Sequence, residues 1–91
     1  MEELATKYIS MAEKVCSELR RTQIPIILTE ETVTAVLNYA NDYLKDAKYY
    51  KAQGKLETSL TSVAYCEGIL DALRLIGAVN FEWPTKQENK K

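Results

Sequence analysis

The chain contains no histidine among its 91 residues. Without an imidazole it cannot form a serine–histidine or cysteine–histidine nucleophile, an imidazole general base or a histidine-containing metal site. Its two cysteines, Cys16 and Cys66, are too few for a four-cysteine zinc site. We therefore predict a protein that is not an enzyme and that needs no cofactor or metal. In a reducing cytosol we expect both cysteines to remain free thiols.

Long apolar runs and an excess of basic residues are also missing. No run approaches the ~18 apolar residues that span a bilayer. The first ten residues, MEELATKYIS, lack the basic-then-apolar order of a signal peptide. A formal net charge of −1 does not favour general binding to nucleic-acid phosphates. We therefore expect a cytoplasmic protein with no membrane contact, for which nucleic acid is a disfavoured partner.

Three helical patterns fill most of the chain, over residues 2–21, 30–53 and 55–76. Apolar residues recur in each at steps of three and four, which places them on one face of a helix. In the first pattern these residues are Leu4, Tyr8, Met11, Val15 and Leu19. With 46% hydrophobic and 27% charged residues, the composition is that of an ordinary globular protein.

Two of the three glycines mark helix ends. Thr29 is a good N-cap for the second helix, and Gly54 and Gly77 are suited to end the second and third. The short turn at Gly54 requires the second and third helices to run antiparallel as a hairpin. We predict an all-α, up-down-up three-helix bundle formed by residues 1–84, with a mobile C-terminal tail, 85–91.

The third glycine, Gly68, lies inside the third helix, four residues from Ala64 and from Ala72. A glycine there costs about 1 kcal/mol relative to alanine, so we expect a neighbouring helix to approach closely at this point. Phe81 and Trp83 follow the last helix, and we expect them to fold back onto the end of the bundle.

Three charged residues, Glu67, Asp71 and Arg74, share one face of the third helix. They form either the helix's solvated strip, with Arg74 pairing to Asp71 within the helix, or a partly buried cluster that meets Arg20 or Arg21 of the first helix. We expect an intermediate case. Asp71 should be half-exposed, bonded within its own helix or to a first-helix cation, and structural in role.

Tyrosines border the apolar face of the second helix. Tyr50 lies beside Asp46, where its hydroxyl can reach a carboxylate or water while the ring packs. Tyr49 points to the opposite, lysine-rich side, near the hairpin tip between Lys45 and Lys55. An exposed ring among lysines can stack on a base, so a nucleic-acid or nucleotide accessory module is an alternative function. A metal-dependent nucleotide hydrolase that uses Glu67 and Asp71 is a third.

Small residues, tyrosines and an aspartate recur at fixed offsets within residues 39–77. The positions are Tyr39, Asp46, Ala47, Tyr49, Tyr50, Gly54, Lys55, Leu60, Tyr65, Gly68, Leu70, Asp71, Ala72 and Gly77. In this pattern the chain resembles the archaeal domain of unknown function 357 family. The resemblance implies a small helical domain that occurs alone or appended to other domains, including predicted nucleotidyltransferases. It implies no established reaction. Carried over by position, it points to Asp46, Tyr50, Tyr65, Gly68 and Asp71.

These observations together predict a module for protein interaction or oligomerisation. Its partner is either another protein, which could be of the nucleotidyltransferase type, or a second copy in a homodimer. The candidate interaction residues are Asp46, Tyr49, Tyr50, Tyr65, Glu67, Asp71 and Arg74.

Overall fold

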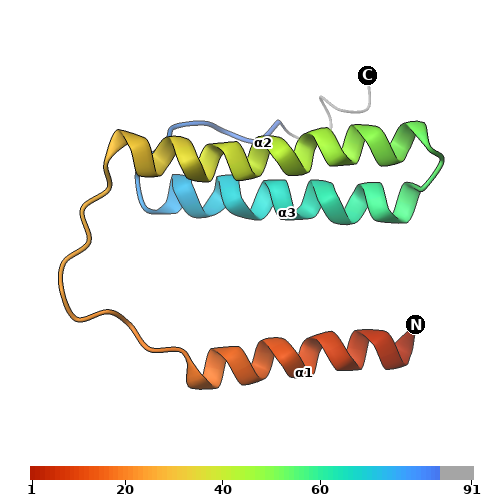
Figure 1. Cartoon of the computed structure of the whole chain (residues 1–91), viewed down its shortest axis with the longest axis horizontal. Helices are drawn as coiled ribbons and strands as arrows, with labels where there is room; N and C mark the ends of the chain where they lie inside the picture. The colour runs from red at the N-terminus through yellow and green to blue at the C-terminus, as the bar shows by residue number, and fades with distance from the viewer. Residues whose placement is uncertain (85–91) are drawn as a thin grey trace.

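The computed structural model describes residues 1–84 and contains three α-helices, with no strand among those residues. The helices are α1 (Glu2–Glu18), α2 (Glu30–Ala52) and α3 (Leu56–Leu75), and they alternate in direction along the chain (Figure 1). The predicted all-α class with three helices is confirmed. The predicted tail, 85–91, lies outside the described residues.

The α2–α3 hairpin is confirmed, and its ends have the predicted chemistry. Thr29 caps α2, since its side-chain oxygen accepts a hydrogen bond from the backbone nitrogen of Thr32 at 3.1 Å. Gly54 has a φ of 79° and Gly77 a φ of 82°. At each glycine the two backbone hydrogen bonds of a Schellman motif close the helix, which is why a residue without a Cβ is found there.

Four small residues and one leucine form the core of the hairpin. The buried side chains are Ala40 and Ala47 of α2 and Ser62, Cys66 and Leu73 of α3. Two of the five are alanines, which lets the α2 and α3 backbones approach closely. The hydroxyl of Ser59 crosses the contact and donates a 2.7 Å hydrogen bond to the carbonyl oxygen of Ala47. No large side chain among the described residues is fully buried.

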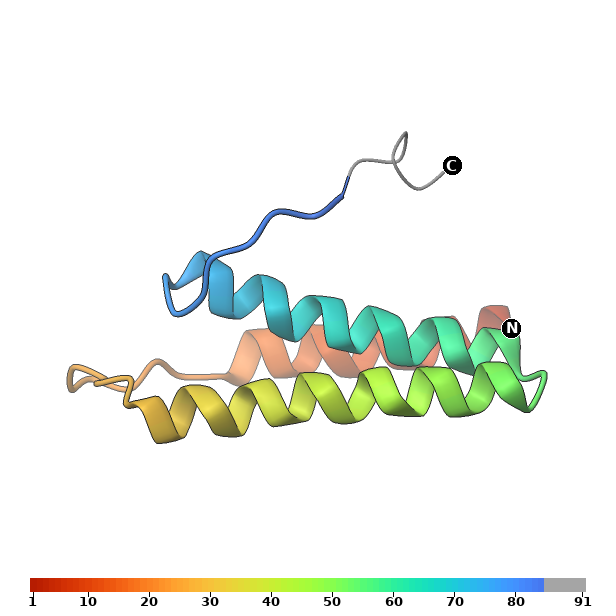
Figure 2. The same ribbon diagram turned by 90° about the horizontal axis from the view of Figure 1, so that it is seen from above.

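Helix α1 does not pack on the hairpin. No Cα atom of α1 lies within 8 Å of one in α2 or α3, and no residue of α1 is buried. The helix also ends at Glu18, three residues before the predicted limit, because Leu19 turns the backbone to an extended conformation with a ψ of 152°. A connector, residues 19–29, is exposed throughout and leads to α2. The chain is therefore a hairpin with a separate helical arm (Figures 1 and 2).

The segment after Gly77 folds back as predicted. Residues 78–84 run back along α3, to which Trp83 is hydrogen-bonded (Figure 2). Helix α1 and this segment lie on opposite sides of the hairpin (Figure 1). The segment therefore covers one flank of the hairpin, and the other flank stays open.

No helix among the described residues is long and apolar enough to cross a membrane.

Candidate functional site

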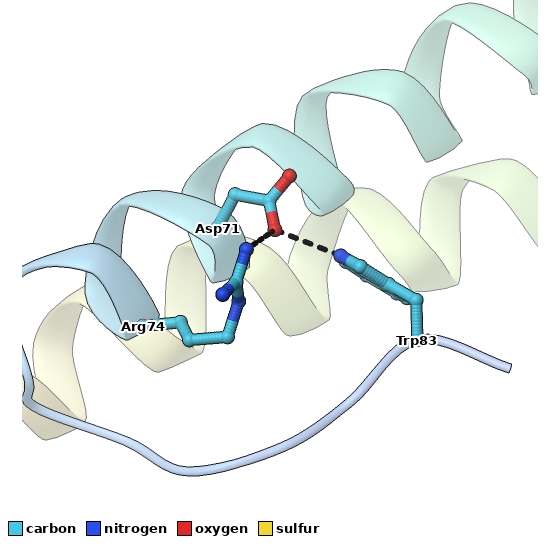
Figure 3. A network of polar contacts seen from close by, with 3 residues as sticks. All are labelled: Asp71, Arg74 and Trp83. Atoms are coloured by element: carbon cyan, nitrogen blue, oxygen red, sulfur yellow. Dashed lines mark hydrogen bonds and ion pairs between the residues drawn. The ribbon is translucent and has the colours of Figure 1, made fainter.

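The charged line of α3 is organised around Asp71. Its Oδ1 accepts a 2.8 Å hydrogen bond from the indole nitrogen of Trp83 and a 3.2 Å hydrogen bond from Nη2 of Arg74 (Figure 3). About two fifths of the Asp71 and Arg74 side-chain surfaces remain exposed. The sequence predicts a half-exposed Asp71 bonded either within its own helix or to a first-helix cation, and the structure shows the first of these.

Arg74 also holds the returning segment through its guanidinium. The guanidinium carbon lies 5.5 Å from the ring centroid of Phe81, a cation–π distance. Phe81 in turn meets Trp83 edge-on, with ring centroids 4.9 Å apart. Two aromatic residues, one carboxylate and one guanidinium thus fasten residues 78–84 to α3. We call these four residues, Asp71, Arg74, Phe81 and Trp83, the latch.

The latch explains the acidity of its carboxylate. The hydrogen bond from Trp83 is the main cause that lowers the pKa of Asp71, and Arg74 lowers it further through its own hydrogen bond and charge. Partial desolvation opposes these effects. Both donors favour the ionised form, so Asp71 serves as a charged anchor and not as a proton donor at neutral pH.

The first helix supplies no cation to this cluster. Asp71 pairs with Arg74 of α3, so of the two alternatives the pairing within α3 is found and the approach of Arg20 or Arg21 is not. The physical reason is that α1 lies clear of the hairpin. Sequence reasoning also missed the Trp83–Asp71 bond, although an indole N–H that packs against a helix needs an acceptor nearby.

Glu67 lies one turn before Asp71. It lines an open hollow whose other residues are Asp71, Trp83 and Pro84. No hydrogen bond or ion pair joins Glu67 to another described side chain. Within residues 1–84, no three Cys, Asp or Glu side chains gather in a group that could hold a metal ion.

The tyrosines divide between two sides of the hairpin. Tyr65 of α3 stacks on Tyr43 of α2, with centroids 4.9 Å apart and ring planes 14° from parallel. Tyr50 meets Tyr49 edge-on at 5.3 Å. By helical spacing, Tyr39, Tyr43, Asp46 and Tyr50 follow one edge of α2, the edge on which Tyr65 lies. Tyr49 belongs to the opposite, polar side.

The flank of the hairpin that carries Tyr43 and Tyr65 is the open one, and we call it the tyrosine face. It lies on the other flank of the hairpin from the latch, because Tyr65 and Asp71 leave α3 in directions about 120° apart. Its residues are Tyr39, Tyr43, Asp46, Tyr50, Tyr65, Ala72 and Ile76. Tyr39, Tyr65 and Ile76 are about three-fifths exposed, so much of this aromatic surface meets solvent.

Gly68 has no close neighbour within residues 1–84, beyond its own helical turn. A Cβ built on it would meet no atom within 4 Å, counting atoms outside its own helical turn. The predicted approach of another helix is therefore not made by α1 or by any other described part of the chain. The space beside Gly68, at the border of the tyrosine face, is open.

Comparison with protein families identifies the family to which the chain belongs. Residues 7–79 match the family model described as "Protein of unknown function (DUF357)". The chain belongs to the DUF357 family. The matched region includes most of α1, the connector, α2 and α3, so the separated arm is part of the DUF357 unit. It ends before Phe81 and Trp83, so the aromatic half of the latch lies outside it. No curated protein and no solved structure matched the chain.

Proposed function

We propose that this DUF357 chain is a non-enzymatic protein-association module of the cytoplasm. Its main contact surface is the apolar stripe of α1. One observation supports this most directly: α1 is an amphipathic helix whose apolar residues pack on no other described helix of the chain. Leu4, Tyr8, Met11 and Val15 are between 48% and 61% exposed.

An uncovered stripe of this kind indicates association. Soluble monomers rarely expose large contiguous apolar patches, and such patches commonly mark interaction sites. A short helix in water also gains most of its stability from packing its apolar face. The apolar stripe of α1 therefore needs a surface on another molecule to pack against. That surface belongs to a second copy or to another protein, for which a nucleotidyltransferase-type protein is one candidate class.

Hydrogen exchange at α1, measured together with solution mass, tests this proposal. Amides of α1 should exchange fast in a dilute monomer and become protected when the partner binds or when the chain concentration rises. Met11→Lys should remove that protection. Ser10→Lys places the same charge on the polar side of α1 and should leave it. Slow exchange of α1 in a particle of monomer mass at every dilution would contradict the proposal.

The hairpin tip supports a second candidate function, nucleic-acid binding. Tyr49 is 59% exposed, and the neighbouring lysines, Lys45, Lys48, Lys51 and Lys55, form no ion pair with a described residue. Phosphate contacts weaken steeply as salt rises, whereas an apolar interface does not. Anisotropy of a labelled single-stranded oligonucleotide, measured over a salt series, separates the two functions. We expect no salt-sensitive binding at micromolar protein.

A further inference from the structure

We infer that the partner of α1 is a second copy of this chain, and that the two copies dock reciprocally. The α1 helix of each copy lies on the tyrosine face of the other. This inference rests on the proposed association function and names the occupant of both surfaces. It follows from four features of the described chain: its excess surface, its open face, the width of the apolar arc on α1, and the position of that arm.

The surface area is far above that of a compact monomer. The chain exposes 8483 Å², whereas a folded monomer of 10.4 kDa exposes about 5,400 Å². The radius of gyration is 16.2 Å, against about 12 Å for a compact chain of this length. The excess is about 3,000 Å² per copy. Two copies together therefore carry an excess of about 6,000 Å², and obligate dimers bury roughly 2,000–5,000 Å² or more in total, so reciprocal docking can account for most of the excess.

The tyrosine face has the character of a helix-binding surface. Tyr39 and Tyr65 provide large exposed rings, and Tyr and Trp are enriched among residues that dominate binding energy. Ala72 is small and exposed, and the space beside Gly68 is open, which allows a backbone to approach. The latch occupies the opposite flank and leaves this one clear.

The apolar arc of α1 is wide enough for two contacts. At about 100° per residue, apolar side chains cover an arc of about 160° from Met11 to Ile9, whereas a helix that packs on one surface needs a stripe of about 100°. The members of the arc are Leu4, Ala5, Tyr8, Ile9, Met11, Ala12, Val15 and Cys16. One side of the arc can meet the second copy's tyrosine face, and the other side can meet the second copy's α1.

The position of α1 favours a second copy over the chain's own hairpin. Helix α1 runs parallel to α3 but lies clear of it (Figure 1), on the side of the hairpin opposite the returning segment. A second chain can insert its own arm there. The same insertion by both chains gives a closed two-fold assembly in which each surface meets its counterpart once.

The connector also fits this arrangement. Its apolar residues Ile24, Ile26 and Ile27 are at least 72% exposed, and in the dimer they gain the identical apolar segment of the second copy to pack against.

The first test is the mass of the full chain in solution, by light scattering. We expect twice the 10.4 kDa chain mass. Tyr39→Lys should raise the dimer dissociation constant at least about tenfold, as expected for an aromatic anchor. Tyr49→Lys is the matched control on the polar side of the same helix, with similar exposure, and should leave the dimer intact. Circular dichroism should show that both variants keep their helices.

The second test identifies which hairpin each α1 contacts. Chains with and without ¹³C are unfolded together, refolded and examined by isotope-filtered nuclear Overhauser spectroscopy. We expect contacts between the Met11 methyl group and tyrosine-face rings to join labelled and unlabelled chains. A dimer in which these contacts are only intrachain overturns reciprocal docking and leaves self-association standing.

A monomer would overturn the inference in one of two distinguishable ways. A monomer with an uncovered α1 shows that the partner is not a second copy, and association with another protein remains the function. A monomer whose α1 covers its own tyrosine face overturns the inference and the proposed function together.

Discussion

The indole nitrogen of Trp83 donates a 2.8 Å hydrogen bond to Oδ1 of Asp71, the same oxygen that Arg74 contacts at 3.2 Å. One carboxylate oxygen therefore joins the segment after Gly77 to the helix before it. Because the chain contains only one tryptophan, its fluorescence reports directly on this contact.

The latch should respond to acid. The folded-state pKa of Asp71 is lowered, so its contribution to stability is present above the unfolded value of about 3.9 and is lost as pH falls through the lower folded value. Asp71→Asn should lower the melting temperature at pH 7, and the gap to wild type should narrow below about pH 3.9. Trp83 emission in wild type should change over the same range.

Asp71→Asn in a Trp83→Phe background is the control for this result. If the Trp83 contact is the main source of the lowered pKa, the loss of melting temperature caused by Asp71→Asn should depend less on pH in that background. In the wild-type background, a loss of melting temperature that is equal at all pH values would show that the charge of the carboxylate is unimportant.

The turn between α2 and α3 depends on a left-handed residue. Gly54→Ala should reduce the free energy of unfolding by about 1 kcal/mol, because a φ of 79° penalises a Cβ. Gly54→Asn should lose less, since asparagine tolerates this conformation better. Urea melts of the three proteins measure the difference, and equal midpoints would contradict the Schellman description of this turn.

The hydrogen bond between Ser59 and Ala47 should contribute measurably to the hairpin. Ser59→Ala removes the donor and leaves the Ala47 carbonyl with only its helical partner, at a cost of about 1 kcal/mol. Thr61→Ala is the control, since the Thr61 hydroxyl bonds only within its own helix at an exposed site. That change should be neutral or slightly stabilising, because alanine is the better helix former. Equal effects of the two substitutions would assign no special role to the interhelical bond.

The two cysteines should differ in reactivity. Cys66 is buried between α2 and α3, and burial is the main cause that raises the pKa of its thiol, with Glu67 adding to the effect. Cys16 is exposed on α1. At pH 8 a thiol reagent should modify Cys16 at least about tenfold faster, because the reactive form is the exposed thiolate. Single-cysteine variants followed by mass spectrometry give both rates, and faster modification of Cys66 would contradict its place in the core.

The hairpin could be predicted from the sequence because its signals are local. Thr29 before Glu30, Gly54 after one apolar pattern and Gly77 after the next each determine the backbone within a few residues. The Asp71–Arg74 pair was predictable for the same reason, since three residues separate its members on one helix.

The arrangement of α1 and the partner of Trp83 were not predictable in the same way. The periodicity of Met11 and Val15 shows that α1 has an apolar face, but not which surface covers it. The Trp83–Asp71 bond spans 12 residues and a chain reversal, so no local pattern encodes it. Gly68 is a further example. A glycine inside a helix indicates that a neighbour can approach closely, but the sequence does not identify that neighbour.

The exposed connector, residues 19–29, has a consequence for assembly. It buries no side chain, so its length and stiffness can change without affecting the fold of either part. A flexible tether of this length would hold α1 near its own hairpin at an effective concentration in the millimolar range. Pro25 opposes this by restricting Ile24 to extended conformations. The stiffness of the connector therefore influences the protein concentration above which the apolar face of α1 is covered by a second copy and not by the hairpin of its own chain.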